Sequence, residues 1–174
     1  MPRYLGSAHD GMGPTDWIAT MGLLSQFGDE ASLVIPAPPE AVWAVVSDLD
    51  GIGERSPECT GVRWLGGATG PGLGARFKGR NRLGPVRWST TSTIEEWDPP
   101  NRLTYVARFL GAATRWTYEL EAVPEGTRVT ERFRTCGSNP VILAGDNLMR
   151  RPLKLRGDMQ RTLEVVLRQV VTGG

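Results

Sequence analysis

The sequence predicts an α+β protein, in which a curved antiparallel sheet is covered on one face by a long C-terminal helix. In residues 60–135, six short runs alternate apolar with polar residues and are separated by Gly, Pro and Asn. Residues 139–171 instead repeat apolar side chains at near-helical spacing. Strands joined by such short connections form an antiparallel meander, and the helix is the one element large enough to cover its apolar face.

The start of the chain differs in pattern from the rest. Residues 1–28 are interpreted as an N-terminal arm that ends in a short amphipathic helix, with Thr15 or Asp16 as the N-cap and Gly28 as the stop. Residues 29–172 are assigned to one domain, because a length of 174 residues fits one domain better than two.

The domain begins with a strand and a helix. Residues 31–35, "ASLVI", predict a strand, and residues 36–50 predict a helix that Pro38 or Pro39 can start. The run "GIGERSP" at 51–57 fits either a turn of helix or a loop. Six further strands are expected at 60–67, 74–82, 86–97, 102–109, 114–123 and 127–135.

The C-terminal segment predicts the helix that covers the sheet. Its apolar residues are Leu148, Leu155, Met159, Leu163, Val166 and Val170. Pro152 should either kink this helix or mark its true start, because proline cannot donate a backbone hydrogen bond.

Strand alternation assigns each side chain to a face, and Glu131 falls on the apolar one. In "RVTERFRT", Glu131 shares its face with Val129 and Phe133. A tight turn centred on Glu125 and Gly126 would place Leu120 opposite Glu131, Tyr118 opposite Phe133, and Glu119 opposite Arg132 on the outer face. The arginine-rich outer face, with its interleaved acids, is interpreted as a solvated surface.

Burial makes Glu131 the candidate catalytic residue. An ionised carboxylate in an apolar site has a large desolvation cost, so either its pKa is raised or it is paired with a donor. Either state suits general acid–base catalysis on a bound ligand. The structural alternative is that Glu131 accepts hydrogen bonds from Tyr, Trp or Arg neighbours, or lies at a wet rim.

Several inward positions carry small or polar residues, so the space between sheet and helix is expected to be incompletely filled. Such a space would form a mostly apolar pocket for a small organic molecule. An inward amide could orient a ligand carbonyl, and the aromatic rings could hold a polycyclic ligand, although each could also serve packing alone. The candidate ligand-binding residues are Asn81, Trp88, Ser92, Tyr105, Trp116, Tyr118, Phe133, Leu155 and Met159.

Composition argues against several other classes of function. The formal net charge of +1 gives no bulk attraction to nucleic acid or to an anionic membrane. Two distant cysteines, Cys59 and Cys136, and a single histidine, His9, offer no metal site, and the thiols are expected to be buried and unpaired. We expect no cofactor and find no nucleophile motif. The absence of a secretory signal and of an apolar run long enough for a membrane span predicts a cytoplasmic protein.

Four stretches carry a resemblance to a known family. They are "VIPAPPEAVWAVVSDLD", "GARFKGRNRLG", "TTSTIEEWDPPNRLTY" and "WTYELEAVPEGTRVTERF". Over residues 30–172 the chain resembles the polyketide cyclase/dehydrase branch of the START-like (SRPBCC, helix-grip) superfamily. The resemblance implies a sheet gripping the C-terminal helix, with a deep hydrophobic cavity between them. Members include lipid carriers, aromatase/cyclases and bacterial proteins without a shared catalytic motif.

The sequence therefore supports three hypotheses of function. The first is a cofactor-free cyclase, aromatase or dehydratase of natural-product biosynthesis, in which Glu131 moves protons on a hydrophobic, polycyclic or aromatic substrate. The second is a carrier or sensor that binds such a molecule without chemistry. The third is a protein-interaction module with a filled core. The sequence does not specify the oligomeric state.

Overall fold

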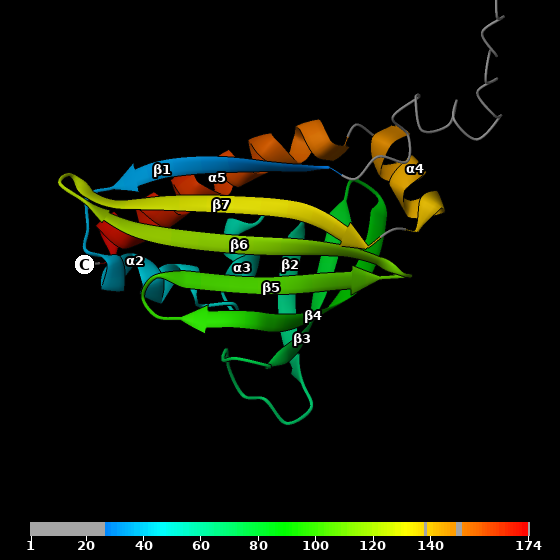
Figure 1. Cartoon of the computed structure of the whole chain (residues 1–174), viewed down its shortest axis with the longest axis horizontal. Coiled ribbons are helices and arrows are strands. Elements are labelled where there is room, and N and C mark those ends of the chain that lie inside the picture. The colour runs from blue at the N-terminus through cyan, green and yellow to red at the C-terminus, as the bar shows by residue number, and fades with distance from the viewer. Residues whose placement is uncertain (1–26, 138, 149–150, 174) are drawn as a thin grey trace, which may run out of the picture.

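Seven antiparallel strands form a single sheet in the order β1-β7-β6-β5-β4-β3-β2 (Figure 1). The computed structural model describes residues 27–137, 139–148 and 151–173. The strands are β1 (Gly28–Ile35), β2 (Cys59–Leu65), β3 (Arg76–Leu83), β4 (Val86–Asp98), β5 (Arg102–Phe109), β6 (Ala112–Val123) and β7 (Gly126–Gly137).

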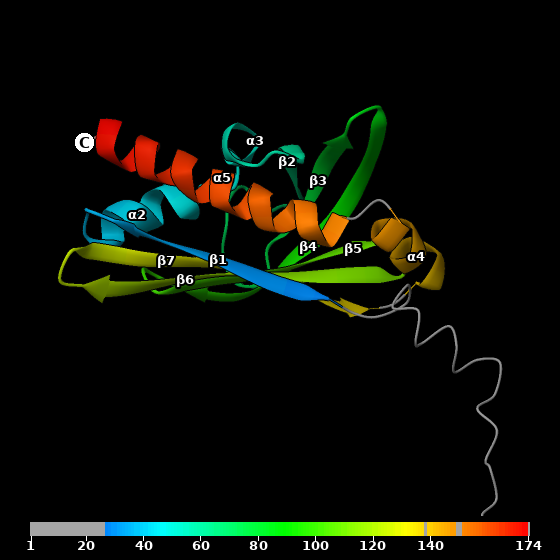
Figure 2. The same ribbon diagram turned by 90° about the horizontal axis from the view of Figure 1, so that it is seen from above.

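Four helices are described, and the longest lies on the concave side of the sheet. Helices α2 (Pro39–Val46) and α3 (Ile52–Arg55) connect β1 to β2, and α4 (Pro140–Leu148) and α5 (Arg151–Thr172) follow β7. Figure 2 shows α5 running across the sheet, with α2 between the C-terminal half of α5 and the strands. The predicted α+β architecture, a curved antiparallel sheet that holds a C-terminal helix, is confirmed.

The helices form where the sequence permits them. Pro39 is the first residue of α2, a position where a missing backbone N–H breaks no helical hydrogen bond. Pro152 is the second residue of α5, so it marks the start of the long helix, which was one of its two predicted roles. The undecided run at 51–57 contains the short helix α3.

The first strand closes one edge of the sheet by pairing with the last. Ile35 lies opposite Thr127, where β7 begins directly after the β6–β7 turn. Gly126 has a φ of 136°, and a Cβ there would overlap the carbonyl oxygen of Ile35. Glycine is therefore required for β1 to approach the turn.

The core lies between α5 and the middle of the sheet. Leu155, Met159, Leu163 and Val166 form one stripe of α5, and each is at most 3% exposed. Beneath the C-terminal half of α5, the ring of Trp43 on α2 packs edge-on against Trp97 on β4, with ring centroids 5.1 Å apart. Trp43 is thus a packing residue.

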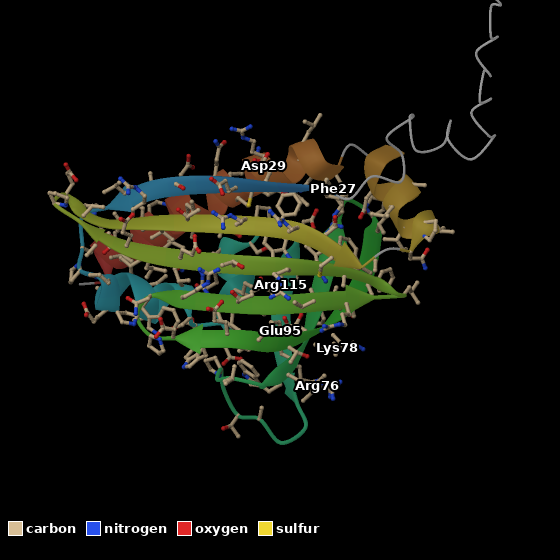
Figure 3. The ribbon with its side chains drawn as sticks, in the orientation of Figure 1. Phe27, Asp29, Arg76, Lys78, Glu95 and Arg115 are labelled. Carbon is tan, nitrogen blue, oxygen red and sulfur yellow. The ribbon has the colours of Figure 1, made fainter. Side chains whose placement is uncertain are left out.

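The outer face of the sheet over strands β1 and β5–β7 is neutralised by ion pairs, some of them with acids of β4. Arg102 bonds to Glu96 and Glu119, and Arg132 bonds to Glu30 at 2.8 Å. Figure 3 shows a similar pair, Glu95 beside Arg115, near the middle of the sheet. Over these strands the prediction of a face with interleaved acids is correct.

Three expectations need correction. The β6–β7 turn is centred on Pro124 and Glu125, because Val123 pairs with Gly126. The register therefore differs by two residues from the expected one: Glu131 lies opposite Tyr118 rather than Leu120, and Arg132 lies opposite Thr117 rather than Glu119. Because the difference is even, every side chain keeps its predicted face.

The other two corrections concern Gly28 and Cys136. Gly28 belongs to β1 rather than ending a helix, and the rest of the predicted helix, up to residue 26, lies outside the described residues. Neither cysteine forms a disulfide, but Cys136 is exposed rather than buried.

The packing of α5 gives a stability prediction. Leu163→Ala should lower the free energy of unfolding by about 2–5 kcal/mol, because the removed side chain leaves a cavity beneath the helix. Val171→Ala is the matched control, since Val171 lies in the same helix and is 57% exposed; its effect should stay within about 0.5 kcal/mol. Urea unfolding of both variants measures this, and equal effects would contradict the assignment of this stripe to the core.

Candidate functional site

A cavity of about 120 Å³ lies between the N-terminal half of α5 and strands β3–β7. Small inward side chains leave this space open, because Gly79 on β3 and Ala107 on β5 line it where larger residues would fill it. Gly79 cannot be enlarged freely, since an added Cβ would lie 3.0 Å from Thr90 Oγ1. The volume is close to that of a cavity that holds one benzene ring, roughly 150 Å³.

Nine of the ten residues proposed as site residues line the cavity. They are Asn81, Trp88, Ser92, Tyr105, Trp116, Tyr118, Glu131, Leu155 and Met159. Strand alternation brings the first seven to the concave face, and the apolar stripe of α5 supplies the last two. Their roles in binding and catalysis remain predictions.

Phe133 is the exception, because it is not among the residues that line the cavity. Its ring lies beside that of Trp116, directly opposite on β6, with centroids 5.5 Å apart, and Phe27 packs edge-on against it at 5.7 Å. Phe133 faces inward as predicted and is 1% exposed, so in this structure it is packed against aromatic neighbours.

Glu131 lies on the floor of the cavity and is 3% exposed. The hydroxyl of Tyr118, directly opposite on β6, donates a hydrogen bond to its Oε1 at 2.7 Å. Its Oε2 is buried without a hydrogen-bond partner among the described residues. A raised pKa and a paired donor were predicted as alternatives for Glu131, and both are present.

Burial raises the pKa of Glu131 from 4.5 to about 8, because the charged form loses its hydration. The hydrogen bond from Tyr118 and the positive charge of Arg55 oppose this effect, and the negative charge of Asp158 adds to it. Arg55 is buried in α3, and its guanidinium bonds to the backbone oxygen of Asp48. Near neutral pH, Glu131 is therefore predominantly a neutral carboxylic acid.

The tyrosines beside Glu131 keep their protons. Burial, followed by the nearby charge of Glu131, raises the pKa of both Tyr105 and Tyr118 well above 10. Both hydroxyls therefore act as hydrogen-bond donors. The polar residues Asn81 and Thr90 add a long hydrogen bond of 3.5 Å on the β3–β4 wall.

An ionic cluster lies at the mouth of the cavity, and its ion pairs were not predicted from the sequence. Arg151, at the start of α5, bonds to Glu58 at 3.0 Å and to Asp146 of α4 at 3.2 Å. Its guanidinium also lies 5.5 Å from the ring centroid of Trp88. Burial raises the pKa of Asp146, although the charge of Arg151 opposes the shift. The cluster ties α4, α5 and the β3–β4 hairpin together.

Two polar residues of α5 also line the cavity and were missed. Asp158 bonds to Lys154, and Thr162 donates a hydrogen bond to the Asp158 backbone oxygen at 3.0 Å. A signal was present, because Asp158 and Thr162 are spaced three and seven residues after Leu155, within the apolar stripe. The prediction for this helix included only the apolar residues of that stripe.

Neither a metal site nor a membrane span is formed by the described residues. Within 27–137, 139–148 and 151–173, no three His, Cys, Asp or Glu side chains are grouped so that they could hold a metal ion. No helix in these ranges is both long and apolar enough to cross a bilayer.

A sheet curved around a long C-terminal helix, with a cavity between them, defines the helix-grip class of the START-like superfamily. The chain belongs to the family described as polyketide cyclase / dehydrase and lipid transport, which matches residues 30–169. The resemblance stated from the sequence is thereby confirmed. A comparison with curated proteins found no match.

Solved structures with the same fold come from several bacteria. A protein from Thermus thermophilus superposes with a TM-score of 0.66 at 20% identity, over 85% of this chain and 99% of that one. The Zhui aromatase/cyclase from Streptomyces sp. R1128 gives 0.63 at 15% identity, over 84% and 96%. A polyketide-cyclase-like protein from Corynebacterium glutamicum gives 0.52 at 28% identity, over 84% and 90%.

The raised pKa of Glu131 predicts a pH dependence of stability. Below pH 4.5 both the folded and the unfolded state hold this proton; between pH 4.5 and about 8 only the folded state holds it. The free energy of unfolding should therefore fall as pH rises through this window, by up to about 1.4 kcal/mol per pH unit from this group. Glu131→Gln should remove this contribution.

Urea unfolding of wild type and Glu131→Gln between pH 5 and 9 measures the difference. The stability of the variant relative to wild type should increase with pH up to about pH 8 and then level off. A pH-independent difference between the two proteins would show that the pKa of Glu131 is not raised. Glu121→Gln, at an exposed site on β6, is the control and should leave the wild-type profile unchanged.

Proposed function

We propose that this protein binds a hydrophobic, aromatic or polycyclic small molecule in its cavity and catalyses cyclisation, aromatisation or dehydration without a cofactor. The observation that carries the proposal is the neutral carboxylic acid of Glu131 on the cavity floor, held by the Tyr118 hydroxyl. An acid with a pKa near the working pH is well suited to both give and take a proton.

The chemistry can be written for a bound chain of alternating ketones. As an enol carbon attacks a ketone carbon, Glu131 gives its proton to the ketone oxygen and takes the proton of the enol hydroxyl. One C–C bond forms, the enol becomes a ketone, the attacked ketone becomes an alcohol, and Glu131 is regenerated. Glu131 can then give its proton to the new hydroxyl, which leaves as water, while the resulting carboxylate takes a proton from the adjacent carbon. A C=C bond forms in the ring and Glu131 is again a neutral acid.

The remaining lining residues would hold the chain folded for this step. The rings of Tyr105, Trp116 and Trp88 provide flat apolar surfaces, and the Tyr105 hydroxyl supplies a further donor. Folding the chain before reaction lowers the entropic part of the barrier. The cavity volume suits one ring, so a larger ligand would extend into the mouth beside Arg151.

The family description and one structural relative support this class of chemistry. The family takes its name from polyketide cyclases and dehydrases, and the Zhui protein of the same fold is an aromatase/cyclase. That the substrate is an aromatic or polycyclic molecule is part of what we propose.

A second function is favoured by a different observation. A neutral Glu131 adds no charge to the cavity floor, so the cavity could hold an apolar molecule without reacting with it. The family description also includes lipid transport. In this role of carrier or sensor, Glu131 would only exchange hydrogen bonds with the ligand.

Native mass spectrometry of protein purified from its own host tests whether either function applies. Both functions predict a bound small molecule that denaturation releases. A protein that is consistently free of ligand, and that does not bind a fluorescent aromatic probe, would contradict both functions.

Glu131→Gln separates the enzyme from the carrier. Gln keeps an acceptor for the Tyr118 hydroxyl but cannot transfer a proton, so turnover of a synthetic poly-β-keto thioester should fall by about 10²–10⁴-fold. The affinity for the fluorescent aromatic probe should change little. The exposed Glu121→Gln variant should keep wild-type turnover. Unchanged turnover in Glu131→Gln would disprove the proton-transfer role and leave the carrier function.

A further inference from the structure

Exposed aliphatic side chains surround the mouth of the cavity. Of the seven large hydrophobic side chains that are exposed among the described residues, four lie at this end: Val86 (49% exposed), Leu110 (68%), Val141 (78%) and Leu153 (75%). Each is within two residues of a residue that lines the cavity. We call these four residues the apolar rim.

The four rim residues come from four separate elements at one end of the molecule. Val86 begins β4 at the β3–β4 hairpin, Leu110 lies in the β5–β6 turn, and Val141 and Leu153 lie in the first turns of α4 and α5. These elements meet at the right-hand end of Figures 1 and 2.

Contacts between these elements hold the rim together. The Asn139 side chain, before α4, donates a hydrogen bond to the Leu110 backbone oxygen at 2.7 Å. Arg151 links the start of α5 both to Asp146 on α4 and to the Trp88 ring on β4.

Leu110 has a backbone conformation that is unfavourable for leucine. Phe109 pairs with Ala112, so Leu110 and Gly111 form a two-residue turn, and both have positive φ, 47° and 81°. Such a turn favours Asn-Gly, because leucine is strained at positive φ. Folding therefore gains nothing from an exposed leucine here, and a binding role explains it better.

Cations without acidic partners lie directly behind the rim. Arg82 and Arg87 face each other on the β3–β4 hairpin, one residue behind Leu83 and Val86. Neither forms an ion pair with a described acidic residue, and like charges placed opposite each other destabilise a hairpin. Further along β3, Lys78 and Arg76 also form no ion pair with a described acidic residue. Figure 3 shows both near Glu95, whose ion-pair partners are Arg108 and Arg115. This arrangement contrasts with the neutralised face over β1 and β5–β7.

We infer that the rim and these cations dock the protein onto an anionic membrane surface, with the cavity mouth against the lipid. Separate aliphatic tips, with no exposed aromatic anchor among the described residues, are poorly suited to a protein partner, whose hot spots are usually Trp, Tyr and Arg. They suit a bilayer interface, where apolar groups enter to a depth of about 5–10 Å. Along a strand, each residue advances about 3.4 Å, so Arg82 and Arg87 would lie at the level of the phosphates.

This inference goes beyond the proposed function, because it concerns where an apolar ligand enters or leaves. A docked mouth would let such a ligand move between lipid and cavity without crossing water. Docking needs no ligand and no proton transfer, so its test is independent of Glu131.

Flotation of the full-length protein with vesicles tests the inference. Wild type should float with vesicles of phosphatidylcholine and phosphatidylglycerol, less with phosphatidylcholine alone, and less at high salt. Leu110→Asn should weaken partitioning about tenfold, because one inserted leucine is lost. The same variant should keep or raise the melting temperature, since Asn suits the turn. A loss of binding can then not be attributed to unfolding.

Two further variants complete the design. Leu73→Asn removes an equally exposed leucine, 72% exposed in the β2–β3 loop, and should bind vesicles like wild type. Arg82→Gln with Arg87→Gln should abolish the preference for anionic vesicles. Failure of wild type to float with either vesicle, or wild-type partitioning of Leu110→Asn, would overturn the inference. A rim that instead mediates self-association, seen as a dimer that Leu110→Asn dissociates without any vesicle binding, would also overturn it.

Discussion

A straight helix packs against a curved sheet, and the two surfaces can be in close contact over only part of their length. At the C-terminal half of α5, the second helix α2 and the Trp43–Trp97 pair fill the space, and Leu163 and Val166 are buried. At the N-terminal half no helix of the described residues fills the space between α5 and strands β3–β7, and small residues such as Gly79 and Ala107 leave a cavity. The position of α2 therefore determines which end of the molecule is solid and which end is hollow.

The hollow end concentrates the polar groups that a solid core would exclude. Glu131 is buried where an aliphatic residue would pack without a desolvation cost, and burial outweighs both Tyr118 and Arg55 in setting its pKa. At the mouth, Arg151 holds Glu58 and Asp146 in a cluster that is mostly removed from solvent. Buried Glu131 and the buried ionic cluster each lower the stability that an apolar core would give. Such features are typical of sites used for binding or catalysis.

Most of the fold could be predicted from the sequence, because strand alternation is insensitive to small errors in register. The turn before β7 lies one residue earlier than expected, so the register shifts by two and Glu131 still faces inward. Its actual partner, Tyr118, could not be predicted, because that depends on which residues form the turn. Phe133 was placed on the correct face, but alternation cannot show that it packs between Trp116 and Phe27 instead of lining the cavity. The ionic cluster was missed because it joins residues from the segment before β2, from α4 and from α5, and no local pattern relates these segments.

The sheet order has a consequence for how the chain can assemble. Among the described strands, β1 pairs only with β7. Ile35, for example, lies opposite Thr127, which is far away in the sequence. During synthesis on the ribosome, β1 must therefore remain without its strand partner until nearly the whole sheet has emerged. Such non-local pairing slows folding and leaves an unpaired edge accessible to other nascent chains. The first strand to be synthesised can therefore join the sheet only after the last strand, β7, has been made.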